Sequence, residues 1–235
     1  MKTVDQPDQS IFFEQWDIYK GVIDNNYMYH AELIDVVKEE VNQFEAPSIL
    51  DLGCGDSYVI SESLDDDREV DYWGVDSSDR ALEFAKTSLD RVKGEITFIN
   101  EDLLEALENI ERSFDVIISG YSLHHLQTEN KEKCFSLISD LISDQGVFII
   151  YDLEKNSDET HDQYINRVCN IFSTEWNELD ERAIENITTH VKDNDLPENE
   201  IFYLDNFESA GFSDMKKVFR DKDNVFTAYT ARKLV

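Results

Sequence analysis

Residues 48–57 read Ser-Ile-Leu-Asp-Leu-Gly-Cys-Gly-Asp-Ser, a short apolar strand that runs into a glycine turn. Turns of this kind commonly hold the phosphates of a nucleotide at the first strand of a parallel sheet. Here Tyr58 stands where the dinucleotide fingerprint needs its third glycine, and Asp51 and Asp56 flank the turn. Acids repel a pyrophosphate, and no P-loop lysine lies nearby. The turn therefore favours a ligand with a cationic centre over NAD or ATP.

The composition indicates one folded domain of strong negative charge. Of 235 residues 41% are hydrophobic, enough for a core, and 52 Asp and Glu against 21 Lys and Arg give a net charge of −31. Such a surface repels nucleic acids and anionic lipids. Two explanations stay open, which are solubility or adaptation to high salt, and an acidic surface that recruits a basic partner.

The sequence carries no targeting signal that we recognise. Its first ten residues lack the features of a signal peptide, and no apolar run approaches the roughly 20 residues that span a membrane. The three cysteines, Cys54, Cys134 and Cys169, are odd in number and show no metal-binding spacing. Reduced thiols in a cytoplasmic protein are the expected state.

Strand and helix patterns alternate on either side of the glycine turn, which predicts a parallel sheet with helices on both faces. The predicted strands are 49–52, 70–75, 95–99, 114–119 and 147–152, the last opened by Gly146. A helix is expected to begin at about Ser78, and Thr128 is expected to cap another. The predicted antiparallel pair comprises 215–219 and 224–232, joined by a tight turn.

The same patterns divide the single domain, residues 1–235, into four parts. We expect an N-terminal helical cap at 1–45, with a short helix at 11–23, and a cofactor-binding core at 46–153. Two helical stripes predict a helical insertion, or lid, at 154–200. A closing helix and the antiparallel strand pair follow at 201–235.

The turn resembles the first motif of class I S-adenosylmethionine-dependent methyltransferases, with Ser57 where the last glycine usually stands. The motif FDVIISGYSLHHL, which includes Ser119, resembles the fourth motif of that family. The resemblance implies a Rossmann-like seven-stranded sheet of order 3-2-1-4-5-7-6, with the last strand antiparallel. It implies S-adenosyl-L-methionine as cofactor and S-adenosyl-L-homocysteine as product.

The resemblance also assigns cofactor-binding roles to residues that follow the first strands. Asp51 would face the methionine ammonium, and backbone at Gly53 and Gly55 would approach the ligand. The remaining positions are Asp76 with Ser77 at the ribose, Asp102 with Leu103 at the adenine, and Ser119. Bracing of the turn by Asp51 and helix capping by Asp76 or Asp102 are the structural alternatives.

Methyl transfer from a sulfonium needs mainly alignment and exclusion of water, and a base only where the acceptor must lose a proton. His124 and Tyr121 are the catalytic candidates. Adjacent in sequence, His124 and His125 are not expected to point at one atom, so no metal site is predicted. The candidate substrate pocket, for which ordinary packing is the alternative, comprises Tyr19, Tyr27, Met28, His30, His125, Trp176 and His190. Trp176 and the stretch that contains His190 and Asp195 are the candidates for the lid.

No Asn/Asp-Pro-Pro-Tyr tetrapeptide follows the fourth strand, where the sequence is Ser-Gly-Tyr-Ser at 119–122. This argues against methylation of exocyclic base nitrogens or glutamine. The sequence therefore predicts a cytoplasmic enzyme that methylates O, N or S of a small molecule, without a nucleic-acid or membrane partner. Two alternatives are methylation of protein or peptide side chains and a non-catalytic S-adenosylmethionine-binding protein. The oligomeric state is left open.

Overall fold

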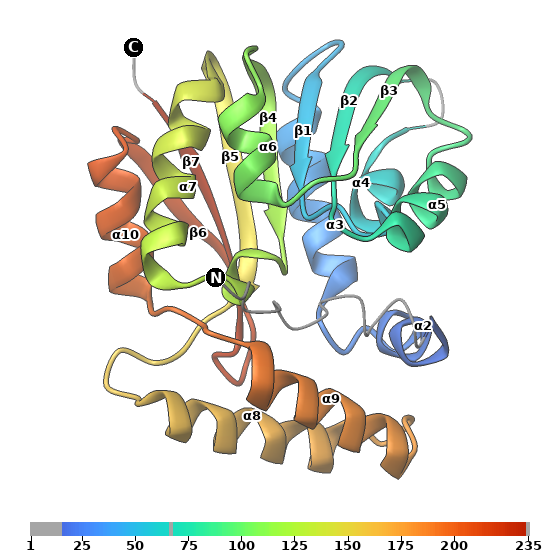
Figure 1. The fold of residues 1–235 in the computed structure, drawn as a ribbon, viewed down its shortest axis with the longest axis vertical. Helices are drawn as coiled ribbons and strands as arrows, with labels where there is room; N and C mark the ends of the chain where they lie inside the picture. Colours follow the sequence, from blue (N-terminus) through green and yellow to red (C-terminus); the bar gives the residue numbers. More distant parts are fainter. Residues whose placement is uncertain (1–15, 66–67, 234–235) are drawn as a thin grey trace, which may run out of the picture.

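A computed structural model of the chain describes residues 16–65 and 68–233. Within these residues one seven-stranded sheet has the order β3-β2-β1-β4-β5-β7-β6, as predicted (Figure 1). Strands β1 to β5 are parallel, and β7 is antiparallel to both β5 and β6. The strands are β1 Ser48–Leu52, β2 Glu69–Val75, β3 Lys93–Ile99, β4 Phe114–Gly120, β5 Ile142–Leu153, β6 Asp214–Arg220 and β7 Phe226–Arg232.

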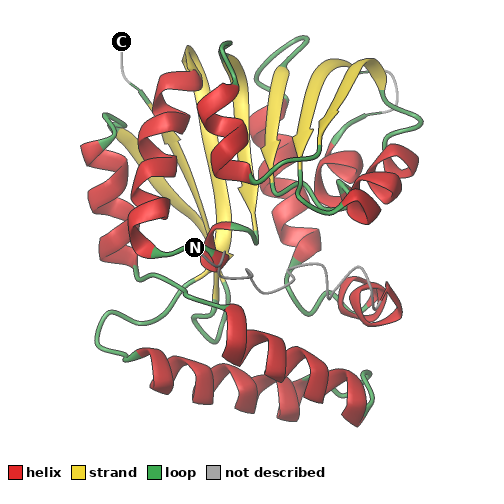
Figure 2. Cartoon of the chain, viewed as in Figure 1, coloured by secondary structure: helices red, strands yellow, loops and turns green. Residues whose placement is uncertain are grey.

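Helices cover both faces of the sheet (Figure 2). They are α2 Trp16–Asp24, α3 His30–Val41, α4 Tyr58–Ser63, α5 Asp79–Ser88, α6 Leu103–Asn109, the 3-10 turn η1 Leu123–His125, α7 Thr128–Leu141, α8 His161–Glu175, α9 Glu181–Asn194 and α10 Glu200–Ser209. Helices α6, α7 and α10 share one apolar cluster with the sheet, and α3 and α4 share another. The central strands are apolar on both faces because both faces are covered.

The antiparallel hairpin of α8 and α9 lies beyond the carboxyl ends of the parallel strands (Figure 1). Its two stripes meet in a third apolar cluster that contains Val168 and Phe172 from α8, Ile187 and Val191 from α9, and Phe226 at the start of β7. The insertion predicted after the core is thus packed against the edge of the sheet where ligands bind in such folds. Its role as a lid stays a prediction.

Several predicted boundaries are corrected by the structure. Thr128 is the first residue of α7 rather than its cap, and its hydroxyl instead donates to Glu198 Oε1 at 2.8 Å. Strand β5 begins at Ile142, four residues before Gly146. The predicted first helix is found as α2, whereas positions 11–15 lie outside the described residues. Ser78 does cap α5, with its side chain accepting from Ala81 N.

No helix in the described part of the chain is long and apolar enough to cross a membrane.

Candidate active site

A cavity of about 210 Å³ opens at the carboxyl ends of β1 to β5. It reaches from the glycine turn after β1 to the α8–α9 hairpin. Its wall includes most of the predicted site residues, namely Tyr19, Met28, His30, Asp51, Gly53, Gly55, Asp76, Ser77, Asp102, Leu103, Tyr121, His124, His125, Trp176 and His190. Ser119 and Tyr27 do not line it.

The glycine turn is held by the second strand and contains three left-handed residues. Backbone N–H groups of Gly53 and Cys54 both donate to the carbonyl of Val75, at 2.8 and 2.9 Å. Gly53 has φ 69° and Gly55 has φ 53°, values that glycine adopts without steric cost. Ser57 also has a positive φ, 57°, although it carries a side chain. A left-handed L-residue costs roughly 1–2 kcal/mol, which explains why glycine suits this position.

Asp51 lies at the floor of the turn and is almost fully buried. Its Oδ2 accepts a hydrogen bond of 3.0 Å from the hydroxyl of Tyr72. Burial raises the pKa of Asp51 to about 7, and the neighbouring carboxylates of Asp76 and Asp56 add to the rise against the lowering effect of Tyr72. The carboxyl group is therefore poised to ionise when a cation approaches.

Asp76 connects the glycine turn to the start of α5. Its Oδ2 accepts from Gly55 N at 2.9 Å and its Oδ1 from Ser78 N at 2.8 Å. Burial raises the pKa of this carboxyl group, and the two backbone hydrogen bonds oppose the rise. Asp76 thus braces the turn while it lines the cavity.

Asp102 lines the cavity and also caps α6. Its Oδ1 accepts from Leu104 N at 2.9 Å and from Glu105 N at 3.4 Å. The helix-capping alternative is therefore present in the structure, and it leaves the second carboxylate oxygen without a role in the cap. Leu103 beside it contributes an apolar surface to the same wall.

Ser119 and Tyr27, the two predicted residues that do not line the cavity, each contact a residue that does. Ser119 Oγ lies 2.9 Å from Ser122 Oγ, which in turn donates to the carbonyl of Leu52. Ser122 is the residue that lines the cavity. Tyr27 stacks on Trp176 with ring centroids 4.9 Å apart, and its hydroxyl accepts from Glu178 N. Tyr27 therefore positions Trp176, which does line the cavity.

Tyr121, which follows β4, forms a hydrogen bond to the segment between α2 and α3. Its hydroxyl donates to the carbonyl of Met28 at 2.5 Å, and its backbone is left-handed with φ 49°. Burial holds the pKa of Tyr121 well above its usual value. With its proton engaged by a carbonyl, the phenol is arranged for positioning rather than for proton uptake. His30 packs against the same ring, and burial lowers its pKa to about 4.

His124 is oriented by Asp152 at the end of β5. Its Nδ1 lies 2.5 Å from Asp152 Oδ1, and its backbone N–H donates to Asp152 Oδ2 at 3.0 Å. Burial lowers the pKa of His124, but the carboxylates of Asp152 and Asp195 outweigh burial and raise it overall. Because Nδ1 faces Asp152, Nε2 points away from Asp152 and toward Asp195.

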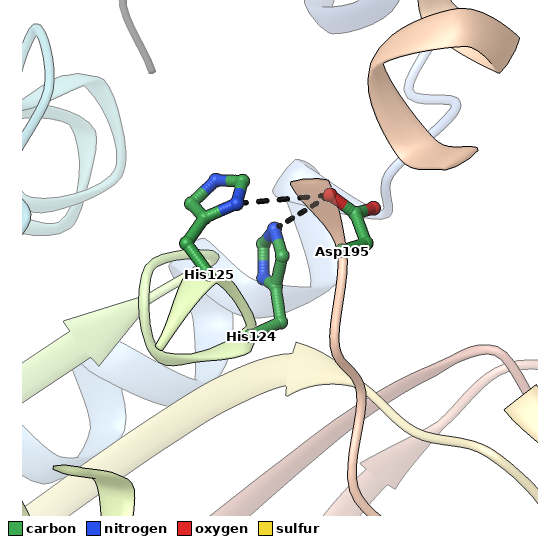
Figure 3. A group of neighbouring side chains, drawn as sticks. All are labelled: His124, His125 and Asp195. Atoms are coloured by element: carbon green, nitrogen blue, oxygen red, sulfur yellow. Dashed lines mark ion pairs between the residues drawn. The ribbon is translucent and has the colours of Figure 1, made fainter. Parts of the chain in front are cut away.

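His124 and His125 do face one atom, contrary to the sequence-based expectation (Figure 3). His124 Nε2 and His125 Nδ1 each lie 3.7 Å from Asp195 Oδ1, and His190 Nε2 lies 3.8 Å from the same oxygen. The expectation was wrong because the two histidines belong to the tight turn η1, where their rings tilt to within 4.0 Å of each other. Burial raises the pKa of Asp195 to about 7.

Asp195 is brought to the histidines by the segment that follows α9. The neighbouring Leu196 N donates to the carbonyl of His124 at 2.8 Å. The buried ammonium group of Lys131 contacts the carbonyl of Leu196 and lies 3.1 Å from Glu198 Oε1. This segment joins the hairpin to the end of β4, and Asp195 lines the cavity from within residues 154–200, the predicted lid.

Other residues that line the cavity were not predicted from the sequence, most of them apolar or small: Cys54, Val59, Ser78, Gly120, Ser122, Leu126, Tyr151, Leu153, Phe172, Ile187, Val191 and Phe226. The apolar stripes of α8 and α9 could have indicated Phe172, Ile187 and Val191. The two sequence motifs could have indicated Cys54, Gly120, Ser122 and Leu126, which lie within them. Within the described residues, the wall contains acids and histidines but no lysine or arginine. This donor set fits a ligand with cationic centres, as the sulfonium and ammonium of S-adenosylmethionine are.

Comparison with known proteins agrees with the fold and the cavity. A family model described as "Methyltransferase domain" matches residues 44–200. An uncharacterised methyltransferase of Schizosaccharomyces pombe is 31% identical over 119 residues, which are 49% of this chain and 43% of that relative. The chain thus spans less than half the length of that protein. Carboxy-S-adenosyl-L-methionine synthase 1 of Yersinia pseudotuberculosis is 22% identical over 86% of this chain and 85% of its own.

Among solved structures, magnesium protoporphyrin IX methyltransferase of Synechocystis PCC 6803, with bound S-adenosylhomocysteine, has a TM-score of 0.65 at 15% identity and covers 97% of each chain. The sheet order and the cavity at its switch point define a Rossmann-like methyltransferase domain. The family model matches two thirds of the sequence, and the chain belongs to the class I S-adenosylmethionine-dependent methyltransferase family.

Proposed function

We propose that the protein transfers a methyl group from S-adenosylmethionine to an O, N or S atom of a small acceptor in the cytoplasm. The observation that carries this proposal is a single cavity with two chemically distinct ends. One end is the acid-flanked glycine turn, and the other is a histidine–carboxylate cluster beneath apolar side chains of the hairpin. The three cysteines are all unpaired, which supports a reducing compartment.

The acid-flanked end suits the methyl donor. Asp51 would pair with the ammonium group, and backbone at Gly53 and Gly55 would approach the methionine part. Asp76 would accept the ribose hydroxyls, and Asp102 the adenine amino group. When bound, S-adenosylmethionine supplies a methyl group on a sulfonium and leaves as S-adenosylhomocysteine.

The other end suits an acceptor that must lose a proton. Asp152 holds Nδ1 of His124, so that Nε2 is presented toward the cavity side occupied by Asp195. Nε2 would take the acceptor's proton as the heteroatom attacks. Phe172 and Trp176 close this end with apolar surface and would exclude water from it.

Enclosure favours a small acceptor over a macromolecule. His124 and Asp195 are buried, with side chains 6% and 3% exposed, so a protein side chain would have to reach them through the hairpin. The acidic surface is the feature that would support a basic peptide as acceptor. A non-catalytic cofactor-binding protein would leave the oriented His124–Asp152 pair unused.

Labelled methyl transfer in a dialysed lysate separates these functions. Purified protein is incubated with methyl-labelled S-adenosylmethionine, the dialysed lysate and the small metabolites that dialysis removed from it. Label is then counted in the protein fraction and in small molecules other than S-adenosylmethionine. We expect label in the small-molecule fraction, with equimolar S-adenosylhomocysteine. Label confined to protein would establish the peptide alternative, and binding without any product would establish the non-catalytic one.

A further inference from the structure

Two imidazole rings and one carboxylate converge at the acceptor end of the cavity, from η1 and from the segment after α9 (Figure 3). We propose that His124, His125 and Asp195 bind a divalent transition-metal ion. No metal site was expected from the sequence, because the histidines are adjacent and Asp195 lies 70 residues further along the chain.

The distances between the three groups fit a shared ion better than direct hydrogen bonds. His124 Nε2 and His125 Nδ1 each lie 3.7 Å from Asp195 Oδ1, and all three atoms lie within 4.8 Å of one another. A hydrogen bond would bring such atoms to about 2.7–3.2 Å. Ligand atoms placed about 2.0–2.2 Å from one tetrahedral ion are separated by about 3.3–3.6 Å. Small side-chain movements would therefore complete the coordination.

Two of these ligand atoms lack any hydrogen-bond partner. Asp195 Oδ1 and His125 Nδ1 are both buried and unsatisfied among the described residues. Asp195 is 3% exposed, so the carboxylate cannot turn to bulk solvent. Buried polar atoms in folded proteins almost always have a partner, and a cation at the centre of this cluster would supply one to both.

His124 has the outer-sphere support that metal-binding histidines usually have. Asp152 contacts Nδ1 and also accepts from the backbone N–H of His124, which fixes the ring and leaves the Nε2 lone pair directed at Asp195. A carboxylate on the far nitrogen orients the ligand and raises its basicity. His190 Nε2, 3.8 Å from Asp195 Oδ1, lies close enough to contribute a fourth donor.

The types of ligand atom indicate which metal ions the site would bind. Two imidazole nitrogens and one carboxylate oxygen suit zinc, cobalt, nickel or ferrous iron, whereas magnesium and calcium prefer all-oxygen sites. The three protein ligands leave at least one coordination position, which would face the cavity and an acceptor heteroatom. A bound ion would use the Nε2 lone pair of His124, so ligation and proton uptake are alternative states of that atom.

Metal binding is tested on the metal alone, without cofactor or acceptor, so that its failure and failure of the methyl-transfer proposal are distinguishable. Protein freed of metal by a chelator is titrated with Zn²⁺ in the presence of a competing indicator. We expect one equivalent to bind, with affinity at least 100-fold weaker in Asp195→Asn and His125→Gln. The matched control His161→Gln changes a histidine outside both the cluster and the cavity and should bind as the unaltered protein does.

The control matters because a chain of net charge −31 attracts cations at many surface sites. Zn²⁺ binding that is equal in Asp195→Asn, or absent from the unaltered protein, would overturn the proposal. Co²⁺ provides a second measurement that does not depend on variants that fold. The unaltered protein should show intense visible bands of low-coordinate cobalt, and the weak spectrum of hydrated Co²⁺ would equally overturn the proposal.

Discussion

Asp152 Oδ1 lies 2.5 Å from His124 Nδ1, and the same carboxylate accepts the backbone N–H of that histidine. The two hydrogen bonds join the end of β5 to η1 after β4, two strands that are neighbours in the sheet. His124 is therefore held at both its ring and its backbone. Because Nδ1 contacts Asp152, Nε2 is the ring nitrogen that is left to take up a proton or bind a ligand in the cavity.

Replacing Asp152 by Asn should lower methyl transfer by about 10²–10⁴-fold, the usual contribution of a positioned base. An amide that donates to Nδ1 would place the imidazole proton on Nε2, where it blocks proton uptake. The rate of S-adenosylhomocysteine formation measures the effect. Cofactor affinity should stay within about twofold, because Asp152 does not line the cavity. An unchanged rate of methyl transfer in a folded variant would show that His124 takes no part in the reaction.

Removing the carboxylate of Asp76 should abolish measurable cofactor binding. Asp76→Ala deletes the group predicted to hold the ribose and also frees Gly55 N and Ser78 N. Asp71→Ala is the matched control, since Asp71 lies in β2, the strand that Asp76 follows, but pairs with Arg112 away from the cavity. Isothermal titration with S-adenosylmethionine compares the two. Undiminished binding by Asp76→Ala would contradict the assigned site.

The glycine-turn end of the cavity was predictable because its residues follow consecutive strands. Asp51, Asp76 and Asp102 come directly from or after β1, β2 and β3, and parallel strands bring their carboxyl ends to one edge. Local sequence patterns place each strand end within a residue or two. Topology then brings the three acids to one cavity wall.

The histidine–carboxylate end of the cavity was only partly predictable because it depends on contacts between distant segments. Asp195 reaches His124 through the hydrogen bond of Leu196 to the carbonyl of His124, which no local pattern indicates. The expectation that His124 and His125 do not point at one atom rested on their adjacency in the sequence alone. In η1 the two rings tilt toward each other, and Asp195 approaches both of them from another element. Apolar lining residues looked like ordinary core in the sequence.

Ser57 offers a test of strain in the glycine turn. Ser57→Gly should keep stability within about 1 kcal/mol, because relief of the left-handed strain offsets the lost contact of Oγ with Tyr72. Ser57→Ala keeps the strain and loses the contact, so it should be less stable than the glycine variant by about 1 kcal/mol or more. Urea unfolding of the pair measures the difference. Equal stabilities would mean that the turn relaxes without strain.

Cofactor affinity should increase with pH up to about 7 through ionisation of Asp51. Its pKa is raised to about 7 in the free protein, mainly by burial, so below that pH the carboxyl is neutral and must lose its proton to pair with the ammonium group. Affinity should then fall by a factor approaching ten for each unit below pH 7. Titrations between pH 5.5 and 7.5 measure this slope. Asp51→Asn should bind weakly with a flatter profile, and an equal slope would assign the effect to another group.

His30 should make the fold sensitive to mild acid. Burial lowers its pKa to about 4, whereas in the unfolded chain it is near the ordinary value of about 6.5. The unfolded state therefore binds the proton first, and stability falls as the pH drops from about 6.5 to 4, by up to about 3 kcal/mol for this group. Above pH 6.5 both states are neutral and the effect vanishes. His30→Gln cannot titrate, so the gap between its unfolding free energy and that of the unaltered protein should shift by about 2.4 kcal/mol between pH 7 and pH 4.5. A constant gap would show that His30 takes up its proton in the folded state with an ordinary pKa.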